Sequence, residues 1–260
     1  YENARTQKLF LLGIFYGIIG FLIVYNVFAW TILKQSAYLY YILLLLAAAV
    51  FQLAWDGLIP RVSVFGGPEA LLHLGTAAFS VVRICNILFV ESFMDARGKF
   101  PRMYRLLDIL LVAAVALALL YLANFYVGNR LMMTFAPFLA FILTVVLGAM
   151  WYKGETHARY LFLAHLPFPP TAALVACVLV GYVPYHPVLI QLAKVAYLWQ
   201  AIFFSLALAD RFAEIQRSFR SILEDTVAKR SAALIAANES LHREIRERMR
   251  TEEELRQAKD

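Results

Sequence analysis

Seven long apolar runs dominate this sequence and restrict what it can fold into. They cover residues 9–33, 37–55, 70–94, 106–124, 131–152, 158–183 and 187–209. An α-helix needs about 20 mostly apolar residues to cross a hydrocarbon core of roughly 30 Å, and each run meets that requirement. The runs are too long for strands and lack a two-residue alternation, which excludes a membrane β-barrel. The sequence therefore predicts an all-α membrane protein with a seven-transmembrane helix bundle.

Charge and cysteine content exclude several other classes of protein. The chain is 62% hydrophobic and only 16% charged, whereas soluble domains are about 45–50% apolar and about 25% charged. Its net charge of +6 comes from short basic loops beside apolar runs, which argues against nucleic-acid binding. Cys85 and Cys177 lie inside apolar runs, so they suit neither a disulfide framework nor a metal site. We expect no metal and no cofactor.

Basic residues near the ends of the runs predict the orientation, because Lys and Arg are retained on the cytoplasmic side. With the N-terminus outside, the inner loops hold seven basic residues and the outer segments hold four. The inner residues are Lys34, Arg97, Lys99, Arg102, Arg105, Lys153 and Arg159, and the outer ones are Arg5, Lys8, Arg61 and Arg130. We expect a multi-pass protein with its N-terminus outside and its C-terminus in the cytoplasm.

Residues 210–260 form a charged segment that is distinct from the membrane body at residues 1–209. This segment has 11 Lys/Arg and 11 Asp/Glu and contains neither Pro nor Gly. Leu and Ile recur every three or four residues, which predicts one long helix. We expect it to pair in parallel as a coiled coil that makes the protein a homodimer, with a lone helix or a partly disordered leash as the alternative. The predicted seam is formed by Val227, Leu234, Leu241, Ile245 and Leu255.

Three stretches in this order resemble the bacterial seven-transmembrane receptors with diverse intracellular signalling modules. The first lies in the first span, the second covers the start and end of the second span, and the third lies where the last span leaves the membrane. The matching residues are Gly13-Ile14-Phe15-Tyr16-Gly17 with Tyr25-Asn26, then Ser36-Ala37-Tyr38-Leu39-Tyr40-Tyr41 with Gln52 and Gly57, then Phe204-Ser205-Leu206-Ala207-Leu208-Ala209-Asp210-Arg211.

The resemblance implies a receptor of the bacterial inner membrane that has two further domains. A periplasmic sensory domain would precede the first span, and an enzymatic output domain would follow the last one. The chain begins with Tyr1 rather than Met, and we expect both domains to lie outside it. Residues 244–259 are similar to the linker of sensor kinases. A histidine kinase of a two-component system is therefore the expected output, with a diguanylate cyclase as the second candidate.

His242 has a passing similarity to the phosphoacceptor box of histidine kinases. That box has an acidic residue directly after the histidine and a proline a few positions later. Here Arg243 follows His242, and the rest of the chain contains no proline. We therefore interpret His242 as an exposed linker residue and expect no catalytic residue and no enzyme activity in this chain.

The third span holds the most polar residues of the membrane body: His73, Arg83, Asn86 and Glu91. Arg83 lies about 18 Å from the cytoplasmic end of the span at 1.5 Å per residue, which is near the middle of the bilayer. A charge there is costly, so it must face the bundle interior or a wet cavity. These residues and His165 are candidates for an internal ligand site or a switchable hydrogen-bond cluster. The alternative is a fixed structural bridge from Arg83 to Gln52, Asp56 or His165.

Lys194 and a group of prolines complete the candidates. Lys194 lies in the last span, as the retinal lysine of rhodopsins does, but Glu91 is at the wrong depth to serve as its counter-ion. We expect Lys194 to reach the outer surface or to pair inside the bundle. Pro167, Pro169 and Pro170 must kink the sixth span, and the kink is a candidate hinge for signalling.

A transporter or channel with an oligomerisation tail is the alternative to a receptor. Many transporters contain internal repeats and paired broken helices in corresponding halves. Only the sixth span is broken here and no repeat is visible. The sequence therefore favours a signalling receptor.

Overall fold

The computed structural model describes residues 2–57, 68–94, 100–184 and 187–257, and within this part the secondary structure is entirely α-helical. The predicted all-α fold is therefore confirmed. The helices are α1 (Glu2–Leu33), α2 (Ser36–Trp55), α3 (Pro68–Met94), α4 (Pro101–Ala123), α5 (Phe125–Tyr152), α6 (Ala158–His165), α7 (Phe168–Val180) and α8 (Pro187–Gln257).

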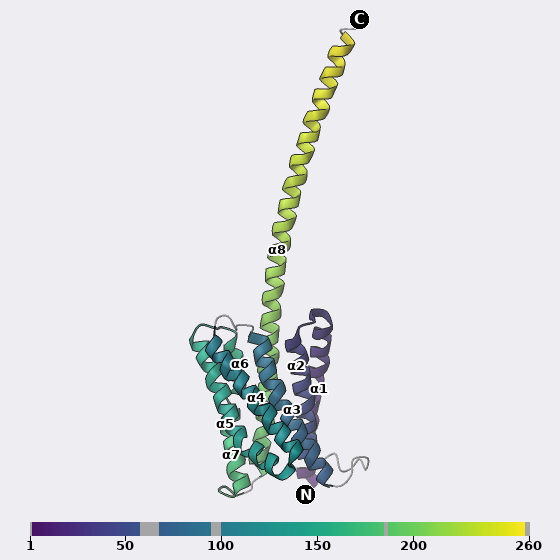
Figure 1. Ribbon diagram of the computed structural model, residues 1–260. Coiled ribbons are helices and arrows are strands. Elements are labelled where there is room, and N and C mark those ends of the chain that lie inside the picture. The colour runs from purple at the N-terminus through teal and green to yellow at the C-terminus, as the bar shows by residue number, and fades with distance from the viewer. Residues whose placement is uncertain (1, 58–67, 95–99, 185–186, 258–260) are drawn as a thin grey trace. The chain divides into compact units, whose positions relative to one another are not determined.

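The structure has two compact units, residues 1–208 and residues 209–260. The first unit is a helical bundle in which α1 packs against α2, α2 packs against α3, and α5 packs against α4, α6 and α7 (Figure 1). The first part of α8 belongs to this bundle, and the remainder of α8 makes up the second unit.

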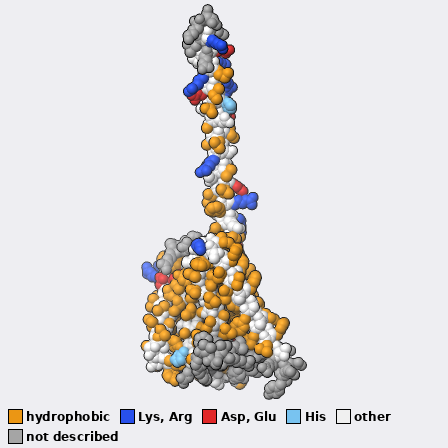
Figure 2. All heavy atoms as spheres, turned by 90° about the vertical axis from the view of Figure 1, so that its right-hand side faces the viewer, with side chains coloured by type: hydrophobic (Ala, Val, Ile, Leu, Met, Phe, Trp, Pro, Cys, Tyr) orange, Lys and Arg blue, Asp and Glu red, His pale blue; other side chains and the backbone are white. Residues whose placement is uncertain are grey.

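The bundle has the surface of a membrane protein. Within the described residues, α1 to α5 and α8 are each long and apolar enough to cross a membrane. Large apolar side chains such as Phe21, Val112 and Phe138 are exposed on them, and hydrophobic side chains cover much of the bundle face seen in Figure 2. Soluble proteins rarely expose apolar surface on this scale. The predicted multi-pass membrane protein is confirmed.

The sixth span consists of two helices rather than one. Helix α6 has 8 residues and α7 has 13, so neither crosses a bilayer alone. Leu166 and Pro167 lie between them and keep right-handed helical backbone angles. The hydrogen-bond pattern stops because Pro167, Pro169 and Pro170 have no backbone N–H. Together α6 and α7 occupy one predicted span and complete the seven-transmembrane bundle.

The connection between the fourth and fifth spans is shorter than the apolar runs suggest. The sequence leaves residues 125–130 outside both spans, whereas the structure places them in α5 and leaves only Asn124 between the helices. The Asn124 Oδ1 atom accepts a hydrogen bond from the Val127 N–H at 3.2 Å, which caps α5. A Cβ atom on Gly128 would lie 2.2 Å from the Tyr121 Cα atom, so only glycine allows this close approach. Hydropathy marks where lipid contact begins, not where a helix begins.

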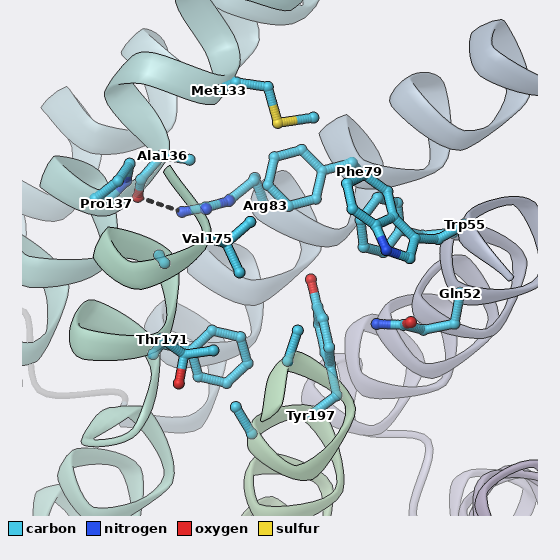
Figure 3. Close-up of a pocket in the computed structure, with 15 residues that line it drawn as sticks. Gln52, Trp55, Phe79, Arg83, Met133, Ala136, Pro137, Thr171, Val175 and Tyr197 are labelled. Atoms are coloured by element: carbon cyan, nitrogen blue, oxygen red, sulfur yellow. Dashed lines mark hydrogen bonds between the residues drawn. The ribbon is translucent and has the colours of Figure 1, made fainter. Parts of the chain in front are cut away.

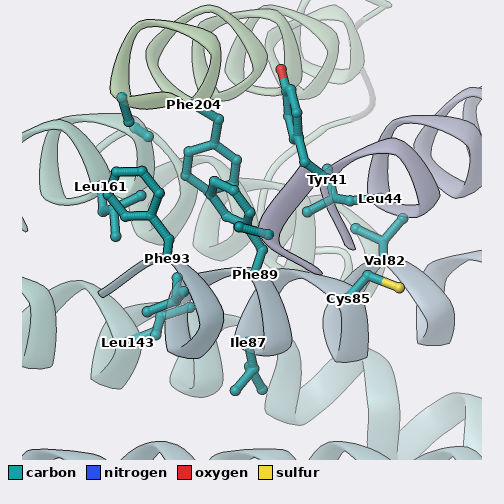
Figure 4. Close-up of a cluster of buried hydrophobic side chains, with 14 of the residues drawn as sticks. Tyr41, Leu44, Val82, Cys85, Ile87, Phe89, Phe93, Leu143, Leu161 and Phe204 are labelled. Carbon is teal, nitrogen blue, oxygen red and sulfur yellow. The ribbon is translucent and has the colours of Figure 1, made fainter. Parts of the chain in front are cut away.

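The core of the bundle contains a group of aromatic side chains from three helices (Figure 4). The Phe89 ring on α3 lies 4.4 Å from the Phe204 ring on α8 and 5.5 Å from the Tyr41 ring on α2. All three side chains are fully buried. Aromatic pairs at these separations add about 0.5–1.5 kcal/mol each beyond the free energy of area burial. This group therefore fixes the first part of α8 against α2 and α3.

The second unit is a single helix, and many of its described apolar side chains are exposed. Val227, Leu234, Leu241 and Ile245 are between 45% and 71% exposed. The side chain of Leu255 lies outside the described residues. Ion pairs between residues four apart, such as Lys229–Asp225 and Arg248–Glu244, lie along this exposed helix. Pairing with a second copy remains a prediction.

Candidate functional site

Two tyrosines of α2 hold the first part of α8 by hydrogen bonds. The Tyr41 hydroxyl donates to the Ala201 carbonyl oxygen at 2.6 Å and lies 2.9 Å from Ser205 Oγ. The Tyr38 hydroxyl donates to the Leu208 carbonyl oxygen at 3.4 Å. Carbonyls of a regular helix already accept one hydrogen bond, and these phenols use the remaining lone pairs. The contacts tie the position of α8 to that of α2.

A buried ion pair joins α8 to the end of α2. Lys194 Nζ lies 2.5 Å from Asp56 Oδ1, and both side chains are more than nine-tenths buried. The Tyr16 hydroxyl on α1 donates to Asp56 Oδ2 at 3.2 Å. Lys194 therefore pairs inside the bundle, one of the two arrangements that the sequence predicts. A charge in this environment needs such a partner, because desolvation of an isolated ion is expensive.

The proline break, residues 166–170, is linked to α8 through a tryptophan. In a regular helix the Leu163 carbonyl would accept a hydrogen bond from the N–H of residue 167, but Pro167 has none. Instead, Trp199 Nε1 on α8 donates to the Leu163 carbonyl oxygen at 2.8 Å. The Thr171 hydroxyl and the Thr171 N–H both donate to the Pro167 carbonyl oxygen, at 2.6 and 3.2 Å. The Leu163 carbonyl at the break is thus satisfied from α8, and the regular hydrogen bonds of α7 resume at the Pro167 carbonyl.

His165, at the end of α6, lies at the centre of a second polar contact between helices, which we call the His165 cluster: His165, Asn86 and Gln200. His165 Nδ1 is 2.7 Å from the Leu161 carbonyl oxygen, an acceptor only, so Nδ1 carries a proton. Asn86 Oδ1 lies 3.0 Å and Gln200 Nε2 lies 3.3 Å from His165 Nε2. A neutral ring accepts from an amide N–H at Nε2, whereas a protonated ring donates to an amide oxygen. The cluster therefore has two hydrogen-bond arrangements, one for each charge state of His165.

Arg83 lies on α3 and binds a backbone carbonyl rather than a carboxylate. Arg83 Nη1 donates to the Ala136 carbonyl oxygen at 3.0 Å, next to Pro137 in α5. The guanidinium carbon lies 4.8 Å from the centre of the Phe79 ring, a cation–π contact. A direct bridge to Gln52, Asp56 or His165 was expected as the structural alternative, and the structure does not contain it. Asp56 is instead the partner of Lys194.

A cavity of about 100 Å³, which we call the Arg83 cavity, lies between α2, α3, α5, α7 and α8 (Figure 3). Its polar lining residues are Gln52, Arg83, Thr171 and Tyr197. Its aromatic lining residues are Phe51, Trp55, Phe79 and Phe168. Arg83 also borders a smaller cavity of about 30 Å³ that contains Asn86, His165 and Gln200 in its wall. Of the five candidates from the sequence, Asn86 and His165 therefore lie beside Arg83.

The other two candidates, His73 and Glu91, lie elsewhere on α3. The Tyr121 hydroxyl donates to the His73 carbonyl oxygen at 2.8 Å and lies 3.2 Å from His73 Nδ1. The Glu91 carbonyl oxygen accepts a hydrogen bond from the Tyr104 hydroxyl at 3.5 Å. Neither residue lines the two cavities around Arg83. In the part of the chain that the structure describes, no group of three or more His, Cys, Asp or Glu side chains could hold a metal ion.

Two residues of this region, Tyr197 and Trp199, were not identified from the sequence, and Asp56 was named there only as a possible partner of Arg83. Tyr197 and Trp199 look like ordinary aromatic residues of a membrane span, and Asp56 lies just after the apolar run of α2. The prolines could have indicated a role for a residue such as Trp199. Each proline leaves one helix carbonyl without its usual donor, and an N–H group on a neighbouring helix can take that place. The pairing of Asp56 with Lys194 joins residues that are 138 positions apart, and nothing local indicates it.

Comparison with known proteins agrees with this architecture. Residues 8–211 match the family model described as 7TM diverse intracellular signalling. No curated protein and no solved structure matches the chain. The family match covers the bundle from residue 8 onward, including the contacts of α8 and the Arg83 cavity. The chain therefore belongs to the family of 7TM diverse intracellular signalling proteins.

Proposed function

We propose that the chain is the membrane and linker part of a signalling receptor in the bacterial inner membrane. In this proposal the bundle receives an extracellular or membrane cue and passes it through α8 to an output domain downstream. A histidine kinase of a two-component system is the favoured output, and a diguanylate cyclase is the second candidate. The tail pairs with a second copy as a coiled coil, so that the active receptor is a homodimer.

The contacts of α8 carry this proposal. Inside the bundle, α8 contributes Lys194 to the ion pair, Trp199 to the proline break and Gln200 to the His165 cluster. The same helix continues to Gln257 in the second unit. Any rearrangement of these contacts therefore acts on a helix that ends outside the bundle. A helix can transmit a rotation or a shift along its axis, because its backbone is rigid and its hydrogen bonds are internal.

The output is tested with the full-length natural protein in membrane vesicles. For a kinase we expect ATP-dependent labelling of a histidine, with a phosphoryl group that is lost in acid. For a cyclase we expect formation of cyclic diguanylate from GTP. A reading frame that stops directly after Asp260, or a downstream domain with neither activity, would contradict the proposed output.

The orientation is tested with reporter enzymes fused to truncated chains. Gly154 lies between α5 and α6, and Pro184 lies between α7 and α8. Fusions after Gly154 and Asp260 should show cytoplasmic activity, and a fusion after Pro184 should show periplasmic activity. The opposite pattern at Gly154 or Pro184 would overturn the proposed topology.

A further inference from the structure

The Arg83 cavity contains hydrogen-bond donors that the protein itself does not use. A guanidinium has five N–H groups, and Arg83 makes one hydrogen bond, to Ala136, and no ion pair within the described residues. The Tyr197 hydroxyl and the Gln52 amide also line the cavity, and neither makes a hydrogen bond to another described residue. Figure 3 shows the Tyr197 hydroxyl and the Gln52 amide pointing into the space that Arg83 borders.

A comparison with Lys194 shows what Arg83 lacks. The bundle supplies Lys194 with the Asp56 carboxylate at 2.5 Å. Arg83 is also located within a membrane helix, and its neighbours in the cavity are aromatic and aliphatic side chains with a few neutral polar groups. A cation in such surroundings is costly without an anion. The arrangement therefore favours an anion that comes from outside the chain.

The size and lining of the cavity define the chemistry of that anion. The volume of about 100 Å³ is smaller than an apolar cavity of about 150 Å³ that holds benzene, but the Arg83 cavity is not fully enclosed, so the body of a small ligand can extend through its opening. Phe51, Trp55 and Phe79 offer flat apolar surface for a ring or a short chain. A carboxylate matches the planar fork of arginine and leaves its body free to contact these rings. A phosphate group would fill the space without using the aromatic walls.

We propose that the Arg83 cavity binds a small carboxylate with an aromatic or short aliphatic body. The carboxylate pairs with the Arg83 guanidinium and accepts hydrogen bonds from Tyr197 and Gln52. The body of the ligand lies against Phe51, Trp55 and Phe79. The ligand also contacts α7 through Thr171, beside the proline break, and α8 through Tyr197. The role of this ligand as the cue for the receptor rests on the proposed function, whereas the binding of the ligand to the cavity does not.

Binding is tested on the protein in lipid nanodiscs at neutral pH with 4-fluorobenzoate, followed by fluorine NMR. We expect saturable binding that weakens at least tenfold in Arg83→Leu and several-fold in Tyr197→Phe. The neutral analogue 4-fluorobenzyl alcohol should bind at least tenfold more weakly than the carboxylate. Arg130→Leu is the matched control, because Arg130 is exposed and lies outside the cavity. Its affinity should equal that of the unchanged protein.

The proposal is overturned if neither 4-fluorobenzoate nor hexanoate shows saturable binding. It is also overturned if Arg83→Leu binds 4-fluorobenzoate as tightly as the unchanged protein does and the neutral alcohol binds as tightly as the carboxylate. A thermal melt of each variant shows whether it is folded, and Arg83→Lys replaces Arg83→Leu if the latter does not fold. The full-length receptor then separates binding from signalling. A change of output with 4-fluorobenzoate that is lost in Arg83→Leu supports the role as cue. Binding without a change of output overturns the role as cue, but the proposal of a carboxylate-binding site still stands.

Discussion

The two cationic side chains Lys194 and Arg83 lie inside the bundle in different electrostatic environments. Lys194 has a carboxylate from Asp56, which also accepts a hydrogen bond from Tyr16. Arg83 has a backbone carbonyl and an aromatic ring. The first arrangement neutralises charge within the chain and ties three helices together. The second leaves a positive charge beside a cavity, and it is the arrangement expected of a residue that serves binding.

The Lys194–Asp56 pair should stabilise the fold. Lys194→Met leaves the Asp56 carboxylate buried without its cation, and we expect the free energy of unfolding to fall by about 3–5 kcal/mol. Asp56→Asn should cost a similar amount, because it leaves Lys194 unpaired. The double variant should recover much of the loss, since neither charge is then buried alone. Unfolding in mixed detergent micelles, followed by circular dichroism, measures each value.

Lys229→Met provides the matched control for this prediction. Lys229 pairs with Asp225 in the second unit, and the two side chains are 76% and 64% exposed. Such a pair contributes less than about 0.5 kcal/mol. If the losses of the two single variants at Asp56 and Lys194 simply add in the double variant, the pair is not coupled and the interpretation is wrong.

At the residue scale, the sequence predicts which side chains need a partner but not which partner they find. A charge in an apolar run must be neutralised or face a cavity, and this argument identified Arg83 and Lys194. Their partners depend on the packing of helices that are distant in sequence. Ala136 in particular contributes only a backbone carbonyl, which every residue has.

At the scale of elements, the contact between Trp199 and the proline break should hold α6 to α8. Trp199→Phe keeps the ring but removes the N–H, so the Leu163 carbonyl loses its donor from α8. We expect a loss of about 1–3 kcal/mol, the cost of an unsatisfied polar group. Amide hydrogen exchange in α6 and the start of α7 should accelerate, and mass spectrometry of peptides from this region measures it.

Trp151→Phe is the corresponding control. Trp151 lies on α5 with its ring 5.7 Å from the Phe162 ring, and its indole N–H has no hydrogen-bond partner among the described residues. Its replacement should leave exchange in α6 and α7 close to that of the unchanged protein. If amide exchange accelerates equally in Trp199→Phe and Trp151→Phe, the cause is lost aromatic packing and not the lost hydrogen bond.

The tail should pair through the predicted seam. Single cysteines at Val227, Leu234 or Leu241, placed in a protein without Cys85 and Cys177, should crosslink between copies much faster than cysteines at Arg230 or Arg243. The reason is that only the seam positions face the partner in a parallel coiled coil. Equal rates at all five positions would instead indicate a flexible leash.

Hydropathy predicted the elements well where lipid contact and helix coincide. The second span is predicted at residues 37–55 and observed at Ser36–Trp55. It predicted the sixth span less well, because hydropathy does not detect the missing N–H groups of Pro167, Pro169 and Pro170. The prolines themselves did predict a kink. Its stabilisation by a donor on another helix requires the three-dimensional structure.

At the scale of the whole molecule, signalling through α8 predicts a dependence on helical phase. One residue inserted near Asn238 turns the downstream helix by about 100°, whereas seven residues nearly restore its phase. In the full-length receptor, one inserted residue should lock or invert the output, and seven should recover the response. Phosphorylation or cyclic diguanylate formation measures this. If neither insertion changes the output, the tail connects the bundle to the output domain without transmitting the signal through its helical phase.

The placement of the tryptophans makes this protein observable by its own fluorescence. The chain has four tryptophans. Trp199 donates a hydrogen bond at the proline break, and Trp55 lines the Arg83 cavity. With Trp30 and Trp151 replaced by Phe, the tryptophan part of the emission would come from these two positions alone. Its wavelength and intensity would then follow the filling of the cavity and the state of the break in an unlabelled protein.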